Sequence, residues 1–135
     1  QVSMHLTSFG HSCLLIEEHG VRVMIDPGIW SEGHTEVGDL DAVFITHEHP
    51  DHCDVESLSL LRGHNPDLRI YTNKGVGKKL SEAGFTFELF EDGAAMNVKG
   101  LNVEAFGRDH ATIYESFPRF DNTGFLFGGR KWIQN

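Results

Sequence analysis

Residues 46–53 read Thr46-His47-Glu48-His49-Pro50-Asp51-His52-Cys53 and directly follow the apolar run 42–45. Neutral imidazole and carboxylate are common ligands of zinc and other first-row metals. In an extended chain His47, His49 and Asp51 lie on one side, because successive side chains alternate. Pro50 has no backbone donor and disfavours a helical conformation at His49, so we expect a loop that leaves a strand. The pattern predicts a metal site, and the alternative is a solvated polar loop rich in His.

The run T-H-x-H-x-D-H, from Thr46 to His52, resembles the signature of the metallo-β-lactamase superfamily. Two upstream segments, Gly10-His11-Ser12 and Ile25-Asp26-Pro27, look most like the branch of stand-alone metal-dependent hydrolases that includes ascorbate-6-phosphate lactonase. The resemblance implies an α/β fold, the αββα sandwich of the superfamily. This chain would form mainly its N-terminal half, a mixed β-sheet with helices on one face.

The resemblance also implies a metal-ligand role for five residues. His47, His49 and His110 would hold a first ion and leave one position for water, whose pKa the ion lowers to about 7. Asp51 and His52 would begin a second site, and Asp51 would also act as the general base toward that water. Members of the family supply a bridging Asp and a further His from motifs beyond the end of this chain. The sequence therefore accounts for one nearly complete metal site and half of another.

Two further residues are candidates for supporting roles. Asp26 ends the predicted strand 21–25, and an isolated buried carboxylate is costly, so it needs a partner. In the resembling family the matching Asp lies beneath the metal loop and orients its backbone or a ligand His, whereas the alternative is a turn-forming Asp before Pro27. His11 would face the active-site side in the resembling branch, and the alternative is a surface or capping His.

Length and composition narrow the class of protein. The 135 residues suffice for one domain, and we expect a single metallo-β-lactamase-like domain over 1–135, incomplete at its C-terminus. The chain starts with Gln1 and ends directly after an apparent strand, which suggests a fragment, a processed chain or a truncated reading frame. A missing second half would leave sheet edges exposed, so a homo-oligomer is a further expectation.

The net charge of −9 disfavours nucleic-acid binding, which depends on Lys and Arg, so we expect a small-molecule substrate. Bound divalent ions would offset part of this charge.

No apolar run approaches the roughly 18 residues of a membrane span, so no membrane partner is expected. Cys13 and Cys53 are too few for a disulfide framework and, without a secretory leader, indicate a reducing, cytoplasmic setting. We expect Cys53 to be a small packed thiol, not a soft metal ligand.

Hydrophobic patterns predict strands over 2–9, 13–17, 21–25, 41–45, 68–72, 85–90, 94–98, 101–106 and 123–128. Strand 41–45 is continuously apolar, as expected for a strand covered on both faces. Turns are predicted at Glu18-His19-Gly20 and Lys99-Gly100. Residues 29–40 are predicted to form a loop that borders the site. Trp30 and His34 are candidates for contact with substrate, and for His34 the favoured interpretation is exposure to solvent.

Two helices are predicted between these strands. The first is capped by Asp54 and ends at Gly63, and its inward residues are Val55, Leu58 and Leu61. The second, from Lys74 to Ala83, is capped by Asn73 and followed by Gly84, and its inward residues are Val76, Leu80 and Ala83. Gly75 and Gly77 weaken this second helix.

The leading hypothesis is a metal-dependent hydrolase that cleaves a lactone, ester, amide or phosphate ester with one or two zinc ions, or with manganese or iron instead. One alternative is a phosphodiesterase or nuclease of the same fold. The net charge of −9 is evidence against it. Another is a catalytically impaired metal-binding fragment. A flavin-linked diiron oxidoreductase is less favoured, because those enzymes usually carry Glu where this chain has His49.

Overall fold

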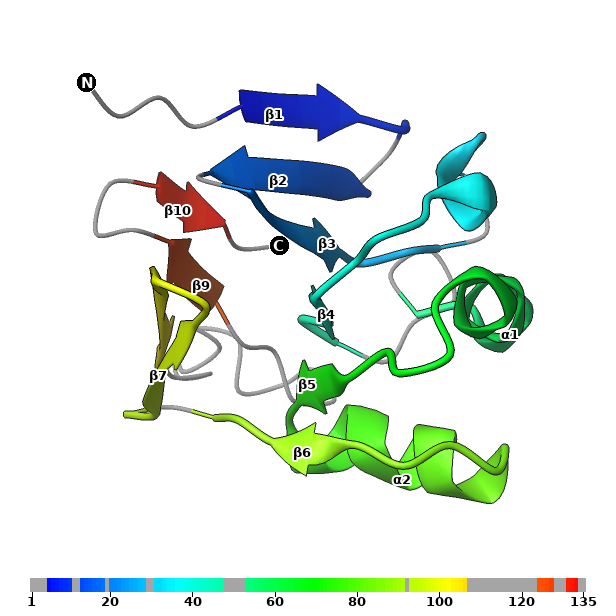
Figure 1. Ribbon diagram of the computed structural model, residues 1–135. Coiled ribbons are helices and arrows are strands. Elements are labelled where there is room, and N and C mark those ends of the chain that lie inside the picture. Colours follow the sequence, from blue (N-terminus) through cyan, green and yellow to red (C-terminus); the bar gives the residue numbers. More distant parts are fainter. Residues whose placement is uncertain are drawn as a thin grey trace.

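The computed structural model describes residues 5–10, 13–18, 20–28, 31–47, 53–91, 93–106, 124–127 and 131–133. Their strands form one sheet of six strands, in the order β1-β2-β3-β4-β5-β6, and one of four, in the order β10-β9-β8-β7. Figure 1 shows two helices on one side of the six-stranded sheet and the four-stranded sheet on the other side. The expected α/β class, a mixed sheet with helices on one face, is confirmed.

The six-stranded sheet is mixed because its first strands are joined by tight turns and its later ones by longer crossovers. β1 (His5–Ser8), β2 (Leu14–Glu18) and β3 (Val21–Ile25) are antiparallel, and the left-handed Gly20 (φ 82°) forms part of the turn between β2 and β3. The parallel strands that follow β3 are β4 (Ala42–Phe44), β5 (Ile70–Thr72) and β6 (Glu88–Leu89). The predicted strand 21–25 is confirmed at both ends. The predicted strand 85–90 is shorter, because β5 offers it only a short edge for pairing.

The core has two parts, one on each face of the central sheet. Residues 42–45 have no exposed surface, and their side chains alternate between the two faces, as the continuous apolar run predicted. Val43 and Ile45 face the helices, whereas Phe44 faces the second sheet. The Phe44 ring meets the Phe125 ring edge-on at a centroid distance of 5.3 Å, which joins the two sheets. Burying a side chain of this size stabilises the fold by roughly 1.5–3 kcal/mol.

Both helices begin where the sequence predicts. Asp54 accepts a hydrogen bond from the Ser57 N–H at the start of α1 (Val55–His64). Asn73 caps α2 (Lys74–Glu82) in the same way. These side chains satisfy backbone donors that the first helical turn leaves without partners.

The ends of the helices differ from the prediction in two places. Gly63 lies inside α1, because the helix continues to a cap at Asn65, whose side-chain amide donates to the Leu61 carbonyl. Ala83 is exposed, not inward, since α2 ends one residue before it. Gly77 is buried, and a Cβ at this position would overlap the ring of Phe87. The close packing of that ring explains a glycine that costs the helix about 1 kcal/mol in propensity.

The second sheet is antiparallel and consists of β7 (Ala95–Val98), β8 (Leu101–Phe106), β9 (Gly124–Phe127) and β10 (Lys131–Ile133). Lys99 and Gly100, both with positive φ, form the predicted turn between β7 and β8. Val103 and Ala105 face the core, and they alternate with the exposed residues Asn102 and Glu104. This period-two pattern is that of a sheet with one covered face.

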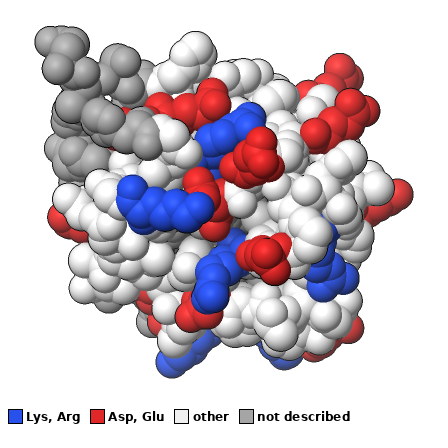
Figure 2. All heavy atoms as spheres, in the orientation of Figure 1, with Lys and Arg blue, Asp and Glu red and all other residues white. Residues whose placement is uncertain are grey.

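The surface carries charges of both signs. Figure 2 shows Lys and Arg side chains interspersed with Asp and Glu on the face that it presents. Among the described residues, no helix is long and apolar enough to cross a bilayer.

Candidate metal centre

The candidate centre lies at the carboxyl ends of three neighbouring parallel strands. Asp26 follows β3, Thr46 and His47 follow β4, and Asn73 follows β5. Because parallel strands end at the same edge of a sheet, these residues lie close together although they are far apart in sequence. This edge is where ligands of open α/β sheets gather.

Asp26 holds the first residue of the histidine motif. Its side chain is fully buried, and Oδ1 accepts the Thr46 N–H at 2.7 Å while Oδ2 accepts the Thr46 hydroxyl at 2.7 Å. Its own N–H donates to the Phe44 carbonyl, so Asp26 is also tied to β4. Its φ of 49° lies in the left-handed region, which Asp tolerates better than most residues. The carboxylate therefore fixes where the motif leaves the sheet.

The same bonds determine which ring nitrogen of His47 carries the proton. His47 is half-buried, and its Nδ1 lies 3.2 Å from Thr46 Oγ1. The single hydroxyl hydrogen of Thr46 goes to Asp26, so Oγ1 can only accept from His47, and Nδ1 must be the protonated nitrogen. The lone pair of the neutral ring is then on Nε2. A metal-binding imidazole whose other N–H is held by a fixed acceptor has this arrangement, so the donor set at position 47 fits a metal ion.

The far end of the motif returns to the same corner of the fold. The Asp54 N–H donates to the Pro27 carbonyl at 3.0 Å, and Pro27 is the residue after Asp26. The Asp26-Pro27 corner thus contacts both the residue before His47 and the residue two after His52. This corner therefore holds residues on both sides of the histidine motif. Neither contact involves a predicted metal ligand.

Five of the predicted site residues lie outside the described part of the chain: His11, His49, Asp51, His52 and His110. Of the five predicted metal ligands, the structure describes His47. Within the described ranges, no three His, Cys, Asp or Glu side chains are grouped to hold a metal ion. The structure thus shows the residues that hold the two ends of the motif in place. The other four ligand assignments stay predictions.

His34 corrects a prediction, because it is 4% exposed and not solvated. It starts a short 3₁₀ turn, η1 (His34–Glu36), that packs against α1. Its Nε2 lies 2.9 Å from Ser57 Oγ, and that hydroxyl donates to Asp54 Oδ2 at 2.7 Å. No sequence pattern predicts this contact, because residues 34 and 57 belong to different elements. The network links the loop bordering the site to the N-terminus of α1.

Burial lowers the pKa of His34 below its usual value of 6.5, and the nearby Asp54 carboxylate offsets this only in part. As the pH falls through 6.5, the unfolded chain takes up the proton before the folded protein does. The stability that comes from neutral His34 is therefore fully present above about pH 6.5 and is lost as the pH falls from there toward the folded pKa.

We therefore expect His34→Gln to cost more stability at pH 7.5 than at pH 5.5, as measured by urea unfolding at each pH. The same measurement on His64→Gln, at the exposed end of α1, gives the effect of losing a histidine outside this network. An equal cost for His34→Gln at both pH values would contradict this role of the buried ring.

Both cysteines are buried free thiols. Cys53 has no exposed surface and packs in the core on the helix side, as expected for a small packed thiol. Burial raises the pKa of the Cys13 thiol to about 12.

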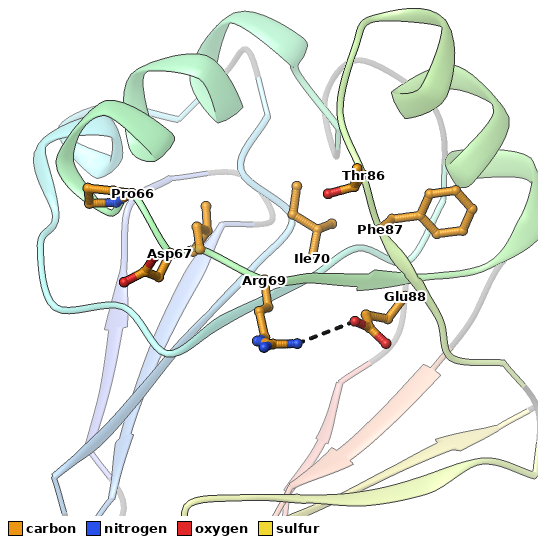
Figure 3. A pocket seen from close by; sticks show the side chains of 8 residues that line it. Pro66, Asp67, Arg69, Ile70, Thr86, Phe87 and Glu88 are labelled. Carbon is orange, nitrogen blue, oxygen red and sulfur yellow. Dashed lines mark hydrogen bonds and ion pairs between the residues drawn. The ribbon is translucent and has the colours of Figure 1, made fainter.

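Two open hollows lie at the opposite, amino-terminal edge of the parallel strands. One, of about 360 Å³, lies between the segments that lead into β5 and β6, and Figure 3 shows Arg69 and Glu88 approaching each other across it, at 3.4 Å. The other, of about 690 Å³, is lined by Arg22, Asp41 and Lys99 among others, and Lys99 pairs with Asp41. Both hollows lie at the edge of the sheet away from the histidine motif, so neither belongs to the candidate centre.

Comparison with known proteins assigns the family. The model of the β-lactamase superfamily domain matches residues 5–131. Protein Rv0786c of Mycobacterium tuberculosis is 38% identical over 95% of this chain and 59% of its own length. A UPF0173 metal-dependent hydrolase of Exiguobacterium is 31% identical, covering 84% of this chain and 48% of that protein. The exodeoxyribonuclease WalJ of Streptococcus pneumoniae is 30% identical, covering 88% and 49%.

The chain spans about half to three fifths of the length of these relatives. The crystal structure of the metallo-β-lactamase fold protein YhfI from Bacillus subtilis superposes with a TM-score of 0.69 at 16% identity, covering 96% of this chain and 60% of that one. The mixed sheet, the helices on one face and the second sheet on the other are thus the arrangement of that fold. The chain therefore belongs to the β-lactamase superfamily and has the metallo-β-lactamase fold.

Proposed function

We propose that the protein is a metal-dependent hydrolase that uses a metal-activated water to cleave a lactone, ester, amide or phosphate ester. One observation carries the proposal: the Asp26–Thr46–His47 chain of hydrogen bonds puts the His47 lone pair on Nε2, where a metal could use it. The similarity to a metal-dependent hydrolase of the same superfamily supports the reaction class.

In this proposal His47, His49 and His110 hold one ion, and Asp51 and His52 begin a second position. A bound ion would supply Lewis-acid chemistry at the scissile bond and would lower the pKa of water toward neutral pH. Asp51 accepts the proton of the attacking water at its carboxylate. Asp26 and Thr46 keep the Nδ1 proton of His47 in place throughout. We propose zinc, since imidazole and carboxylate suit it, with manganese or iron as alternatives.

Among the substrate classes, a lactone follows from the resemblance of Gly10-His11-Ser12 and Ile25-Asp26-Pro27 to the ascorbate-6-phosphate lactonase branch. In that case His11 faces the substrate. The two free thiols agree with a proposed reducing, cytoplasmic setting.

A second candidate function is a phosphodiesterase or nuclease, which the similarity to an exodeoxyribonuclease favours. Two observations oppose it. The net charge is −9, and the face seen in Figure 2 shows basic side chains interspersed with acidic ones instead of gathered in a stripe. Nucleic-acid binding surfaces are usually basic.

The test combines metal titration with a substrate panel. We expect the metal-free protein to bind at least one zinc ion per chain and, once loaded, to hydrolyse a lactone, an aryl ester or a phosphate monoester. Turnover of single-stranded DNA or a phosphodiester alone would favour the second candidate. Metal binding without turnover of any substrate would identify a metal-binding fragment, and the absence of metal binding would overturn the proposal.

A further inference from the structure

Two side chains at the start and middle of α2 hold the two ends of the predicted metal loop. The Asn73 Nδ2 donates to the Thr46 carbonyl at 3.0 Å, and the Lys79 Nζ donates to the Cys53 carbonyl at 2.8 Å. Thr46 directly precedes His47, and Cys53 directly follows His52. Both contacts are to backbone carbonyls, so they set the path of the chain and not the chemistry of any ligand.

An asparagine at position 73 can both cap α2 and donate to the Thr46 carbonyl. Asn73 is fully buried, and its Oδ1 caps α2 by accepting the Val76 N–H at 3.0 Å. Asp, Ser or Thr would cap the helix equally well. The amide is the short side chain that accepts with one atom and donates with the other, and the donated hydrogen goes to the metal loop. The preceding Thr72 adds a parallel contact, since its hydroxyl donates to the Ile45 carbonyl at 2.9 Å.

Lys79 makes the matching contact from the body of the helix. Its neighbour Lys78 is exposed, whereas Lys79 is partly buried with its ammonium on the Cys53 carbonyl. Asn73 and Lys79 lie six positions apart, which is about 9 Å along a helix axis. The helix between them is fixed to the core by Val76 and Leu80, neither of which has exposed surface.

We propose that Asn73 and Lys79 are positioning residues of the metal site, and that α2 clamps the loop of residues 47–52 at both ends. This inference rests on the proposed function, because it gives a role to a loop whose histidines bind a metal. A loop with fixed ends loses less conformational freedom when its ligands converge on an ion. The clamp therefore raises metal affinity without contributing a ligand.

The variants are chosen to remove each donor and keep the rest of its side chain's role. Asn73→Ser keeps a good helix cap but cannot reach the Thr46 carbonyl, and Lys79→Met keeps the apolar stem but removes the ammonium. Lys79→Arg keeps a cationic donor and should restore the contact. The matched controls are Asn102→Ser on the exposed face of β8 and Lys78→Met on α2.

Zinc affinity is measured by competition with a chromophoric chelator. We expect Asn73→Ser to bind zinc about 10-fold more weakly, within the range seen for groups that support metal ligands. Lys79→Met should also bind more weakly, and Lys79→Arg and both controls should bind as the wild type does. Wild-type affinity in Asn73→Ser and Lys79→Met would overturn the clamp.

Hydrogen exchange of the metal-free protein separates the clamp from the proposed function. The backbone amides of residues 47–53 should exchange faster in Asn73→Ser and Lys79→Met than in the wild type and the controls, while those of β3 and β8 should not change. If the wild type binds no metal, the proposed function fails, and the exchange data still decide whether α2 holds the loop. Unchanged exchange in both variants would overturn the clamp even if metal binding is confirmed.

Discussion

Replacing His47 by Ala should remove most of the metal affinity of the first site. Structural zinc sites with four protein ligands bind with roughly 10–16 kcal/mol, so one ligand accounts for about 3–4 kcal/mol, or two to three orders of magnitude in affinity. His49→Ala should have an effect of the same size, since the two residues are predicted to bind the same ion. Zinc affinity and the bound metal per chain, measured by competition titration, check this expectation.

The effect on the metal-free protein should be small. The His47 ring donates from Nδ1 to Thr46 Oγ1, and losing a bond of this kind costs about 0.5–1.5 kcal/mol. The wild type should therefore be stabilised by added zinc, because ligand binding to the folded state raises its stability, while His47→Ala should not be. His64→Ala, at an exposed position on α1, is the control. Wild-type metal content in His47→Ala would remove position 47 from the site.

The parts of the fold that follow from local sequence were predictable. β3 and β8 have the predicted bounds, because a strand pattern between turn residues is recognisable without its neighbours. The same holds for the helix caps Asp54 and Asn73, whose short polar side chains bond to donors three residues away. Gly84, with φ of 87°, ends α2 as predicted.

The contacts that were missed connect residues far apart in sequence. His34 is buried because Ser57, 23 residues later, lies against it, and no periodicity in the loop predicts that. α1 passes Gly63 because the Asn65 side chain bonds both to the helix and to the Val37 carbonyl, 28 residues earlier. Helices often end at a glycine. Here the Asn65 side chain satisfies the Leu61 carbonyl in the last turn, so the helix that continues past Gly63 is more stable.

In the candidate site, too, local patterns were predictable and contacts between distant residues were not. The histidine motif was visible as a pattern of residue types, and Asp26 was a candidate through its resemblance to a family position. The sequence did not indicate the path from Asp26 through Thr46 to His47, since the hydroxyl of Thr46 has no distinctive pattern. Through these two hydrogen bonds the buried Asp26 carboxylate sets the tautomer of His47, a predicted metal ligand. Substituting Asn for Asp26 tests this role.

Asp26→Asn should leave the fold in place and weaken zinc binding by about 10- to 100-fold. The Asn side chain has the same shape, tolerates a φ of 49°, and can still accept the Thr46 N–H with its oxygen. Its NH₂ group, however, now donates to Thr46 Oγ1, where the carboxylate accepted. The hydroxyl hydrogen of Thr46 must then point to His47 Nδ1, and the ring proton moves to Nε2, the nitrogen that should bind the metal.

Two measurements separate this mechanism from general damage. The ¹⁵N chemical shifts of the His47 ring in the metal-free protein report which nitrogen carries the proton, and we expect Nδ1 in the wild type and Nε2 in Asp26→Asn. Urea unfolding of the metal-free variant should remain close to the wild type. Asp39→Asn is the matched control, because Asp39 also has a positive φ, of 58°, and is exposed.

A double substitution tests whether Thr46 transmits the effect. Thr46→Val removes the hydroxyl, so His47 Nδ1 loses its acceptor whatever stands at position 26. Zinc affinity should therefore fall in Thr46→Val, and adding Asp26→Asn should weaken it little further, because residues that act through one contact are not additive. If the two losses add in full, Asp26 acts on the site by a route that does not pass through the Thr46 hydroxyl. The ring tautomer of His47 would then not be what the buried carboxylate controls.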